Sequence, residues 1–166
     1  TLASSDILTA EREEQWCSVN TCLERAIDLL ALDTRDDVQI ELDSEDMPPM
    51  LGVEAELVAI FFNILANCAE AEADDLTIRN KSEVHPNEIA VTIVDNDSGM
   101  DTQARASAFK LYVGTKGNTR GVGLGLVNTL VKRHHGQVAM NSAQGKGTAV
   151  RVTFPVETGE MAGIET

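Results

Sequence analysis

The amino-acid sequence predicts an α+β fold, in which helices and strands follow one another within a single domain. Three observations support this prediction. Three segments carry apolar residues at helical spacing, and several shorter segments alternate apolar with polar residues, as half-buried strands do. Turn residues separate these segments, and 166 residues are enough for one domain with a substantial core. The resulting order is helix, strand, helix, two strands, long loop, helix and two strands.

The first half of the chain is predicted to hold two helices and one strand. Residues 1–17 are charged and are interpreted as the frayed or helical end of a preceding element. From Ser18 apolar residues recur at helical spacing, and Val38–Leu42 alternates like a half-buried strand. Met47-Pro48-Pro49 breaks the chain, and the most apolar helix is expected from about Val53 to Ala73.

The second half is predicted to contain two hairpins separated by a loop and a helix. Leu76–Arg79 and Glu88–Val94 are expected to pair as the first hairpin, and residues 137–154 as the second. Met100–Arg120 carries glycines and no sustained period, and a loop this long in a compact domain is usually functional or mobile. The helix is expected over Gly121–His134, with Leu124, Val127, Leu130 and Val131 facing inward.

Composition limits the function. The sequence is 43% hydrophobic and has a net charge of −14, which argues against nucleic acid or an anionic membrane as the main partner. Cys17, Cys22 and Cys68 are odd in number and lack metal-site spacing, so free thiols in a reducing compartment are expected. The chain has no signal-peptide pattern, and its start at Thr1 suggests a piece of a longer protein.

Asp95 is the first candidate functional residue. The strand-like run Ile89–Val94 is expected to carry this carboxylate to the edge of a sheet. A fixed carboxylate there accepts hydrogen bonds only, so it suits the exocyclic amine of adenine and not the carbonyl of guanine. Such charge-assisted bonds contribute about 1.5–3 kcal/mol. Asp95 is therefore predicted to select adenine.

Glycines at the start of the last helix form the second candidate feature. Gly121, Gly123 and Gly125 allow a phosphate to approach the backbone closely, and the helix that begins there directs free N–H groups at an anion. Lys116 and Arg120 supply positive charge just upstream. A string of this kind is more often an ordinary turn, so the glycines alone leave that alternative open.

A row of polar side chains lies on the apolar helix. Asn63, Asn67 and Glu70 are spaced four and three residues apart and share one face. The asparagines have two interpretations: they cap or cross-link neighbouring elements, or Asn67 together with Asn63 completes the ligand shell of Mg²⁺ beside phosphate oxygens. The presence of Asp95 and the glycines in the same chain favours the metal site.

These motifs resemble those of the ATP-binding fold shared by histidine kinases, type II topoisomerase ATPase domains, MutL-type repair proteins and the ninety-kilodalton heat-shock chaperone. The resemblance covers roughly Ser18–Pro155 and rests on five segments in the family order: Asn63–Ala71, Asp95–Met100, Phe109–Tyr112, Gly121–Leu126 and Gly145–Thr148. It implies a two-layer α+β sandwich of Bergerat type. In that fold about three helices cover one face of a mixed sheet of about five strands, and a flexible ATP lid adjoins the site.

Within this superfamily the sequence is similar to sensor histidine kinases. Met47–Gly52, His135-Gly136 and the Phe109–Tyr112 motif resemble kinase segments. In the topoisomerase, MutL and chaperone ATPases, a glutamate one turn before the metal-binding asparagine activates water. Here that residue is Asn63, which cannot act as a general base.

The resemblance implies roles for individual residues in binding ATP and Mg²⁺. Asn67 and Asn63 are the expected metal ligands, and these two residues and Lys116 are the expected catalytic residues. The expected nucleotide-binding residues are Asp95, Gly99, Lys110, Tyr112, Thr115, Lys116, Arg120, Gly121, Val122, Gly123, Leu124, Gly125, Leu126 and Thr148.

The sequence also departs from the family pattern. Asp97 replaces the first glycine of the motif that begins at Asp95. This departure leaves a non-catalytic nucleotide-sensing or interaction module as one alternative function. An autonomous ATPase is a second alternative. His85 lies in a turn, and His134 and His135 are interpreted as helix caps.

The resemblance therefore implies partners outside this chain. The phosphoacceptor histidine is expected on a separate dimerisation domain, which would make the full protein a homodimer, and a response regulator is the second expected partner. The expected boundaries are 1–17 for the preceding element, 18–155 for the catalytic domain and 156–166 for a tail. The domain is expected to be cytoplasmic, and an inner-membrane anchor elsewhere in the parent protein is compatible with this expectation.

Overall fold

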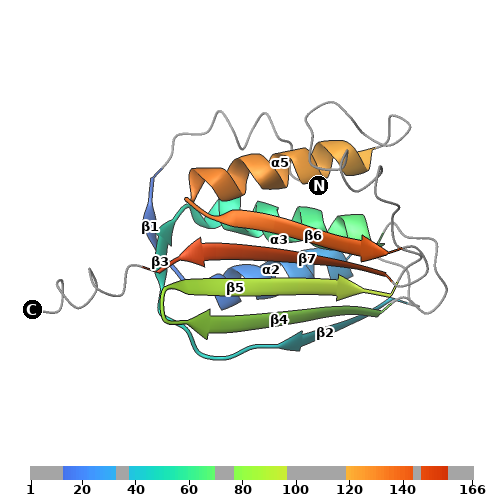
Figure 1. Ribbon diagram of the computed structural model, residues 1–166, viewed down its shortest axis with the longest axis horizontal. Helices are drawn as coiled ribbons and strands as arrows, with labels where there is room; N and C mark the ends of the chain where they lie inside the picture. Colours follow the sequence, from blue (N-terminus) through green and yellow to red (C-terminus); the bar gives the residue numbers. More distant parts are fainter. Residues whose placement is uncertain (1–12, 33–37, 70–76, 97–118, 144–146, 157–166) are drawn as a thin grey trace, which may run out of the picture.

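The computed structural model describes residues 13–32, 38–69, 77–96, 119–143 and 147–156, which form two layers (Figure 1). One layer is a mixed five-stranded sheet with the strand order β2-β4-β5-β7-β6. Its strands are β2 (Gln39–Asp43), β4 (Thr77–His85), β5 (Glu88–Asp95), β6 (Gln137–Ala143) and β7 (Gly147–Pro155). The other layer contains the helices α2 (Val19–Ala31), α3 (Glu54–Ala69) and α5 (Thr119–Arg133). The predicted α+β sandwich is confirmed.

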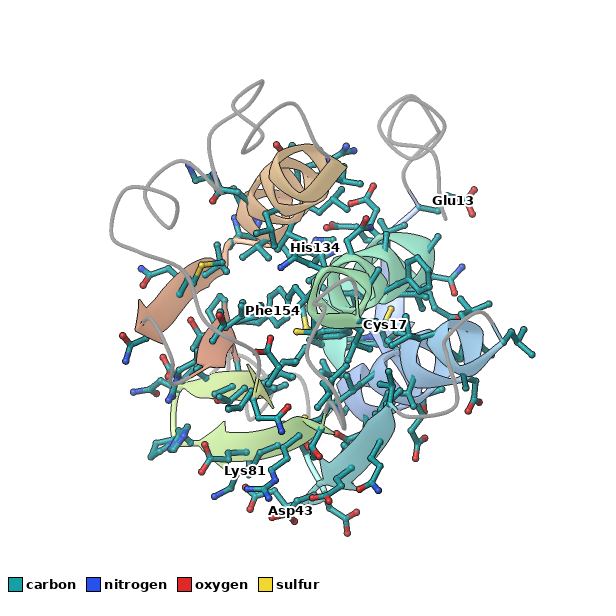
Figure 2. All side chains as sticks on the ribbon, turned by 90° about the vertical axis from the view of Figure 1, so that its right-hand side faces the viewer. Glu13, Cys17, Asp43, Lys81, His134 and Phe154 are labelled. Carbon is teal, nitrogen blue, oxygen red and sulfur yellow. The ribbon has the colours of Figure 1, made fainter. Side chains whose placement is uncertain are left out.

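The sheet has a helix-covered face and a solvent face. Only β2 and β4 run parallel, whereas the other pairs are antiparallel, and β4 and β5 form the predicted hairpin. Side chains alternate between the two faces, so Ile89, Val91, Ile93 and Asp95 of β5 all lie on the buried side. Figure 2 shows the three helices along that side of the sheet.

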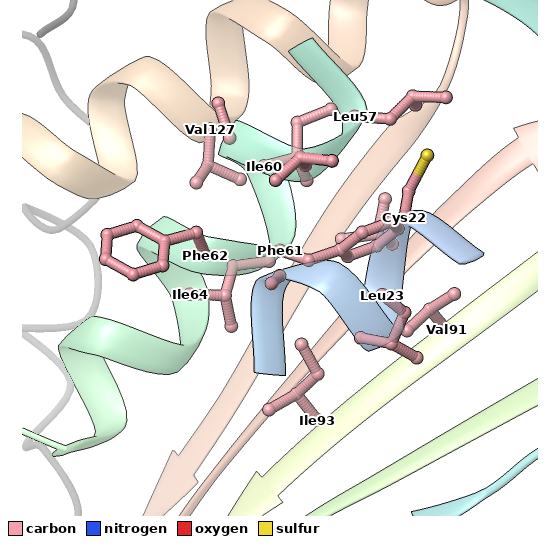
Figure 3. Close-up of a cluster of buried hydrophobic side chains, with 14 of the residues drawn as sticks. Cys22, Leu23, Leu57, Ile60, Phe61, Phe62, Ile64, Val91, Ile93 and Val127 are labelled. Carbon is pink, nitrogen blue, oxygen red and sulfur yellow. The ribbon is translucent and has the colours of Figure 1, made fainter. Parts of the chain in front are cut away.

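Helix α3 forms the centre of the helical layer. It packs against α2 on one side and α5 on the other, which is why it is apolar around most of its circumference. Figure 3 shows its side chains meeting Val127 of α5 as well as Leu23 of α2 and Ile93 of β5. Phe61 and Ile64 are fully buried, and burial of each such side chain contributes about 1.5–3 kcal/mol.

The two outer helices follow the predicted amphipathic pattern. In α2, Val19, Leu23, Ala26 and Leu30 are buried, whereas Ile27 is only partly buried. Ser18 caps this helix, because its side chain accepts a hydrogen bond from the Thr21 N–H at 3.2 Å. In α5 the four residues expected to face inward are all buried: Leu124, Val127, Leu130 and Val131.

Three strands and one helix boundary differ from the sequence prediction. The strand β4 ends at His85 instead of Arg79, so His85 belongs to a strand and not to a turn. Gln15–Cys17 forms the strand β1, which pairs with β3 (Met50–Gly52), so the expected helical end is wrong for these three residues. Strands this short carry no measurable period, and their pairing joins segments far apart in the chain. Helix α5 begins at Thr119, so Arg120 belongs to a helix and not to the predicted loop.

His134 joins two helices at one end of the sandwich, and Figure 2 shows it between α5 and α3. Its Nδ1 lies 2.9 Å from the carbonyl oxygen of Leu130, and its Nε2 accepts a hydrogen bond from the Val53 N–H at 3.1 Å. Val53 precedes α3, so one imidazole ring links the last turn of α5 to the first turn of α3. The neutral ring makes both bonds, with Nδ1 protonated.

No helix in the described ranges is long and apolar enough to cross a membrane.

Candidate nucleotide-binding site

Several elements of the fold end at the edge of the sandwich opposite His134. In Figure 1, α3 and β5 finish there, and α5 and β7 begin there. The first turns of α5 direct free backbone N–H groups and a partial positive charge toward this edge. The predicted site residues Asn67, Asp95 and Thr148 lie near these ends of α3, β5 and β7.

Asp95 is buried at this edge, although it is the last residue of β5. Its exposed fraction is 3%, and it lies directly opposite Thr148 of β7 on the helix-covered face of the sheet. The Thr148 N–H donates to the Asp95 carboxylate, with Oδ1 at 3.2 Å. Thr148 is itself 4% exposed, so the two predicted site residues form one buried polar pair.

Two further residues hold Asp95 in place, and the sequence prediction assigned neither of them a role. Gly147 has a φ of +85°, and a Cβ there would lie 2.2 Å from the carbonyl oxygen of Asp95. The side chain of Asn96 accepts a hydrogen bond from the Thr77 N–H at 2.8 Å, which fastens the start of β4 to the end of β5. A glycine directly before Thr148 and an asparagine directly after Asp95 are the sequence signals for these roles.

The two asparagines of α3, which are the predicted metal ligands, are both buried. Asn63 is 8% exposed and Asn67 is 6% exposed. The Asn63 side-chain N–H donates to the Ala59 carbonyl at 2.7 Å, one turn earlier in the same helix. This bond stays within α3, so it neither caps the helix nor links it to a neighbouring element. The amide oxygen is the atom that a metal ion would need.

Helix α5 presents its glycine segment through the backbone. Leu124 and Leu126 are 1% and 6% exposed and belong to the hydrophobic core, so any contact of these two residues with a phosphate would use main-chain atoms. Gly125 is also buried in this helix, and its carbonyl accepts a hydrogen bond from the Thr129 hydroxyl. Arg120, Gly121, Val122 and Gly123 lie in the first two turns of α5, but only their backbone is described.

The remaining predicted site residues lie outside the described residues. These are Gly99, Lys110, Tyr112, Thr115 and Lys116. The expected lid and Asp97 lie outside them as well.

The chemistry of the described residues fits an adenine nucleotide with a divalent cation. A buried carboxylate accepts from an amine, and carboxamide oxygens are ligands that Mg²⁺ uses in proteins. The start of a helix favours an anion at the same edge. The carboxylate would thus suit adenine, the carboxamide oxygens would suit the metal ion, and the start of α5 would suit a phosphate.

This fold, with its buried carboxylate and its helix carrying two amides, is that of histidine kinase catalytic domains. The chain belongs to the family of histidine kinase-, DNA gyrase B- and HSP90-like ATPases, which residues 52–158 match.

Similar proteins and solved structures agree with this assignment. The chain is 29% identical over 128 residues to the sensory histidine kinase/phosphatase NtrB of Rhodobacter capsulatus, covering 69% of this chain and 36% of that protein. The catalytic domain of histidine kinase ThkA has a TM-score of 0.77 at 16% identity, covering 87% and 98% of the two chains. Full-length ShkA in complex with AMPPNP has a TM-score of 0.76 at 21% identity, covering 88% and 32%. The chain spans about a third or less of the length of the curated relatives it matches.

Proposed function

We propose that this chain is the ATP-binding catalytic domain of a two-component sensor histidine kinase, which transfers the γ-phosphate of ATP to a histidine on a separate dimerisation domain. The observation that carries the proposal is the buried Asp95–Thr148 pair, at the edge where α3 ends and α5 begins. Membership in a family of ATPases and similarity to proteins named sensor histidine kinases support the same assignment.

In this proposal Asp95 recognises the base. The Thr148 N–H donates to its carboxylate, and the two oxygens of a carboxylate together accept several hydrogen bonds. An adenine amine would be a further donor, whereas the guanine carbonyl would face the carboxylate with a second acceptor. Because two acceptors that face each other in a buried site repel, Asp95 would discriminate against guanine.

Asn67, with Asn63, would hold Mg²⁺ against the phosphates. When bound, the ion supplies positive charge that neutralises the transferring phosphoryl group. Neither amide can accept a proton from water, and the nitrogen of Asn63 is held by the Ala59 carbonyl. A site built this way favours transfer to an incoming nucleophile over hydrolysis, and the imidazole of a partner domain would be that nucleophile.

The phosphate contacts are assigned to α5 and the segment before it. In the segment Gly121–Leu126, the N–H groups of Gly121 and Val122 belong to the first turn of α5 and would receive the β- and γ-phosphates, with Lys116 and Arg120 supplying positive charge. Lys110, Tyr112, Thr115 and Gly99 would complete the site from the segment between Asp95 and α5. Catalysis would come mainly from positioning and charge neutralisation.

The proposed partners follow from the reaction. The dimerisation domain would supply the histidine and make the full protein a homodimer, and a response regulator would receive the phosphoryl group. We assign residues 18–155 to the catalytic domain together with the strand β1 (Gln15–Cys17), which pairs with β3. The residues before β1 are assigned to the connection from the dimerisation domain, and 156–166 to a tail. The domain would act in the cytoplasm, beneath an inner-membrane anchor if the parent protein has one.

Calorimetry with ATP and GTP in the presence of Mg²⁺ tests the site. Wild-type protein should bind ATP more tightly than GTP, and Asp95→Asn should lose most of that preference. Asp43→Asn, which changes an exposed carboxylate at the end of another strand, is the matched control and should bind like wild type. No ATP binding at millimolar nucleotide would instead favour the non-catalytic alternative suggested by Asp97.

Phosphorylation of an added histidine-bearing domain of the parent protein tests the reaction. Asn67→Asp should abolish transfer while the circular dichroism spectrum stays that of a folded protein. Rapid ATP hydrolysis by the chain alone, lost in Asn67→Ala, would contradict phosphotransfer and support the autonomous ATPase.

A further inference from the structure

A groove opens between α2 and α3, near the N-terminal end of α3 and therefore at the opposite end of that helix from Asn67. Its cavity volume is about 540 Å³. The apolar part of its lining comes from Leu29 of α2, from Leu32 directly after that helix, and from Ala55 and Val58 of α3. Ala55 and Val58 are three residues apart and share one face of α3, and Leu29 and Leu32 lie at the C-terminal end of α2.

The leucines of this groove are unusually exposed for their size. Leu29 is 43% exposed and Leu32 is 85% exposed, although other apolar residues of α2 are buried in the core. Exposed apolar stripes on two neighbouring helices leave a surface that a third apolar element would cover favourably. The groove is thus a candidate docking surface.

Charges at the groove indicate what kind of partner it suits. Arg25 is paired with Glu54 across the groove, so this cation is already matched. Asp28 also lines the groove, and it makes no hydrogen bond or ion pair within the described ranges. The unmatched charge at the groove is therefore the negative charge of Asp28, on a chain whose net charge is −14.

We propose that this groove docks an amphipathic helix of a partner protein, with an apolar ridge against Leu29, Leu32 and Val58 and a lysine or arginine beside Asp28. Two helices that lie side by side accept the ridge of a third at an interaxial distance of about 8–10 Å, and the small Ala55 allows close approach. A basic side chain both pairs with Asp28 and is attracted by the acidic surface.

The charge disfavours two other occupants. A second copy of this chain would bring another net charge of −14, and an anionic lipid surface would be repelled in the same way. The groove lies on the outer side of α2 and α3 and shares no residue with the nucleotide site, so the inference stands independently of ATP binding.

The test uses two stapled helical peptides with the same leucine ridge, one carrying lysines on the flanks of the ridge and the other carrying glutamates. Their binding to the folded chain is measured by nuclear magnetic resonance, with backbone shifts assigned to residues. The lysine peptide should bind more than about tenfold tighter and should shift the amides of α2 and α3 that line the groove.

Three variants separate docking in this groove from general attraction to an acidic protein. Leu29→Glu should weaken the lysine peptide more than about tenfold, whereas Leu42→Glu, at an exposed leucine on β2, should not. Asp28→Lys should shift the preference toward the glutamate peptide. Equal effects of Leu29→Glu and Leu42→Glu, an unchanged preference in Asp28→Lys, or a self-associated chain that Leu29→Glu dissociates would each overturn the proposal.

Discussion

The two ends of the helix–sheet sandwich both bury polar side chains, but they bury different kinds. At one end, Glu56 is 2% exposed and lies 3.3 Å from Arg133 and 3.9 Å from Nδ1 of His134. The imidazole in turn bonds the backbone of α5 and of the residue before α3. At the other end, the buried groups are the carboxylate of Asp95 and the amides of Asn63 and Asn67.

With the proposed function, this difference would place stabilising contacts at one end of the fold and ligand binding at the other. At the His134 end, the Glu56 carboxylate pairs with Arg133 and with Nδ1 of His134. The Asp95 end gathers oxygen acceptors at the ends of α3 and β5, and the Thr148 N–H already donates to Asp95 there. In the proposed function a nucleotide amine and a metal ion would bind to these oxygens as well. Changes at the first end should therefore affect folding, and changes at the second should affect ligand binding.

The largest expected losses of folding stability come from adding a methyl group to a glycine at the Asp95 end or at the His134 end of the sandwich. Gly147→Ala combines a φ of +85° with a Cβ 2.2 Å from the Asp95 carbonyl oxygen, so it should cost about 3 kcal/mol or more and remove nucleotide binding. Gly136→Ala places a Cβ 2.4 Å from the Thr153 carbonyl oxygen, at the His134 end. It should cost about 2 kcal/mol and leave the nucleotide affinity of the folded protein unchanged. Urea unfolding with and without ATP distinguishes the two; equal loss of affinity would refute the separation.

The next effect concerns the joint between α5 and α3. His134→Phe keeps an aromatic ring but removes the acceptor of the buried Val53 N–H, so it should lower the free energy of unfolding by about 2 kcal/mol. Its ATP affinity should stay within about twofold of wild type. His85→Phe changes an exposed histidine and is the control. A lower ATP affinity in His134→Phe with little loss of stability would contradict this assignment.

A smaller effect is expected at Asn96. Asn96→Ala removes the acceptor of the Thr77 N–H and should cost about 1 kcal/mol, with a modest loss of ATP affinity through a less firmly held Asp95. Asn96→Asp retains an acceptor oxygen and should restore most of the stability. Asn87→Ala, at an exposed position in the β4–β5 turn, should change neither quantity. Wild-type ATP affinity in Asn96→Ala would show that the bond does not position Asp95.

The smallest expected effect on stability at neutral pH is that of the buried thiols of Cys17 and Cys22. Burial raises the pKa of the Cys22 thiol to about 12, with the charges of Cys17 and Glu54 adding to the shift; burial raises the pKa of Cys17 as well. The folded pKa of Cys22 lies above the ordinary value of 9.0, so the folded protein holds this thiol protonated more firmly than the unfolded chain does. The contribution of Cys22 to the free energy of unfolding is therefore fully present below about pH 9 and is lost as the pH rises toward 12.

Alkylation by iodoacetamide, followed by peptide mass mapping, measures this protection. At pH 8 the folded protein should leave Cys22 unmodified, and urea should expose it to rapid reaction. Rapid labelling of Cys22 in the folded protein would show that the thiol is neither buried nor protonated as the structure indicates.

Much of the fold was predictable because its signals are local. The helical periods that begin at Ser18 and near Val53 and the hairpin turn at Pro86 each lie within a few residues, and the structure confirms all three elements. The small sheet of β1 and β3 was not predictable, since three-residue strands show no period and their partners lie far apart in the chain.

The candidate site divides in the same way. The residue types of Asp95, Asn63 and Asn67 and their places in the predicted strand and helix are enough to indicate nucleotide and metal chemistry. Gly147 and Asn96 adjoin predicted site residues in the sequence, but their contacts with the Asp95 carbonyl and the Thr77 N–H cross between strands, so only the folded structure shows what each residue does.

The amino-acid sequence by itself determined the three helices and most strands of the large sheet, and it determined the chemical groups that the chain can offer a ligand, because periodicity and residue type are properties of the chain. Only the tertiary structure decided that Asp95 lies buried beside Thr148, that His134 joins α5 to α3, and that a groove lies open beside Leu29. Each of these depends on which segments pack together, and burial, hydrogen-bond partners and exposed surface arise only from that packing.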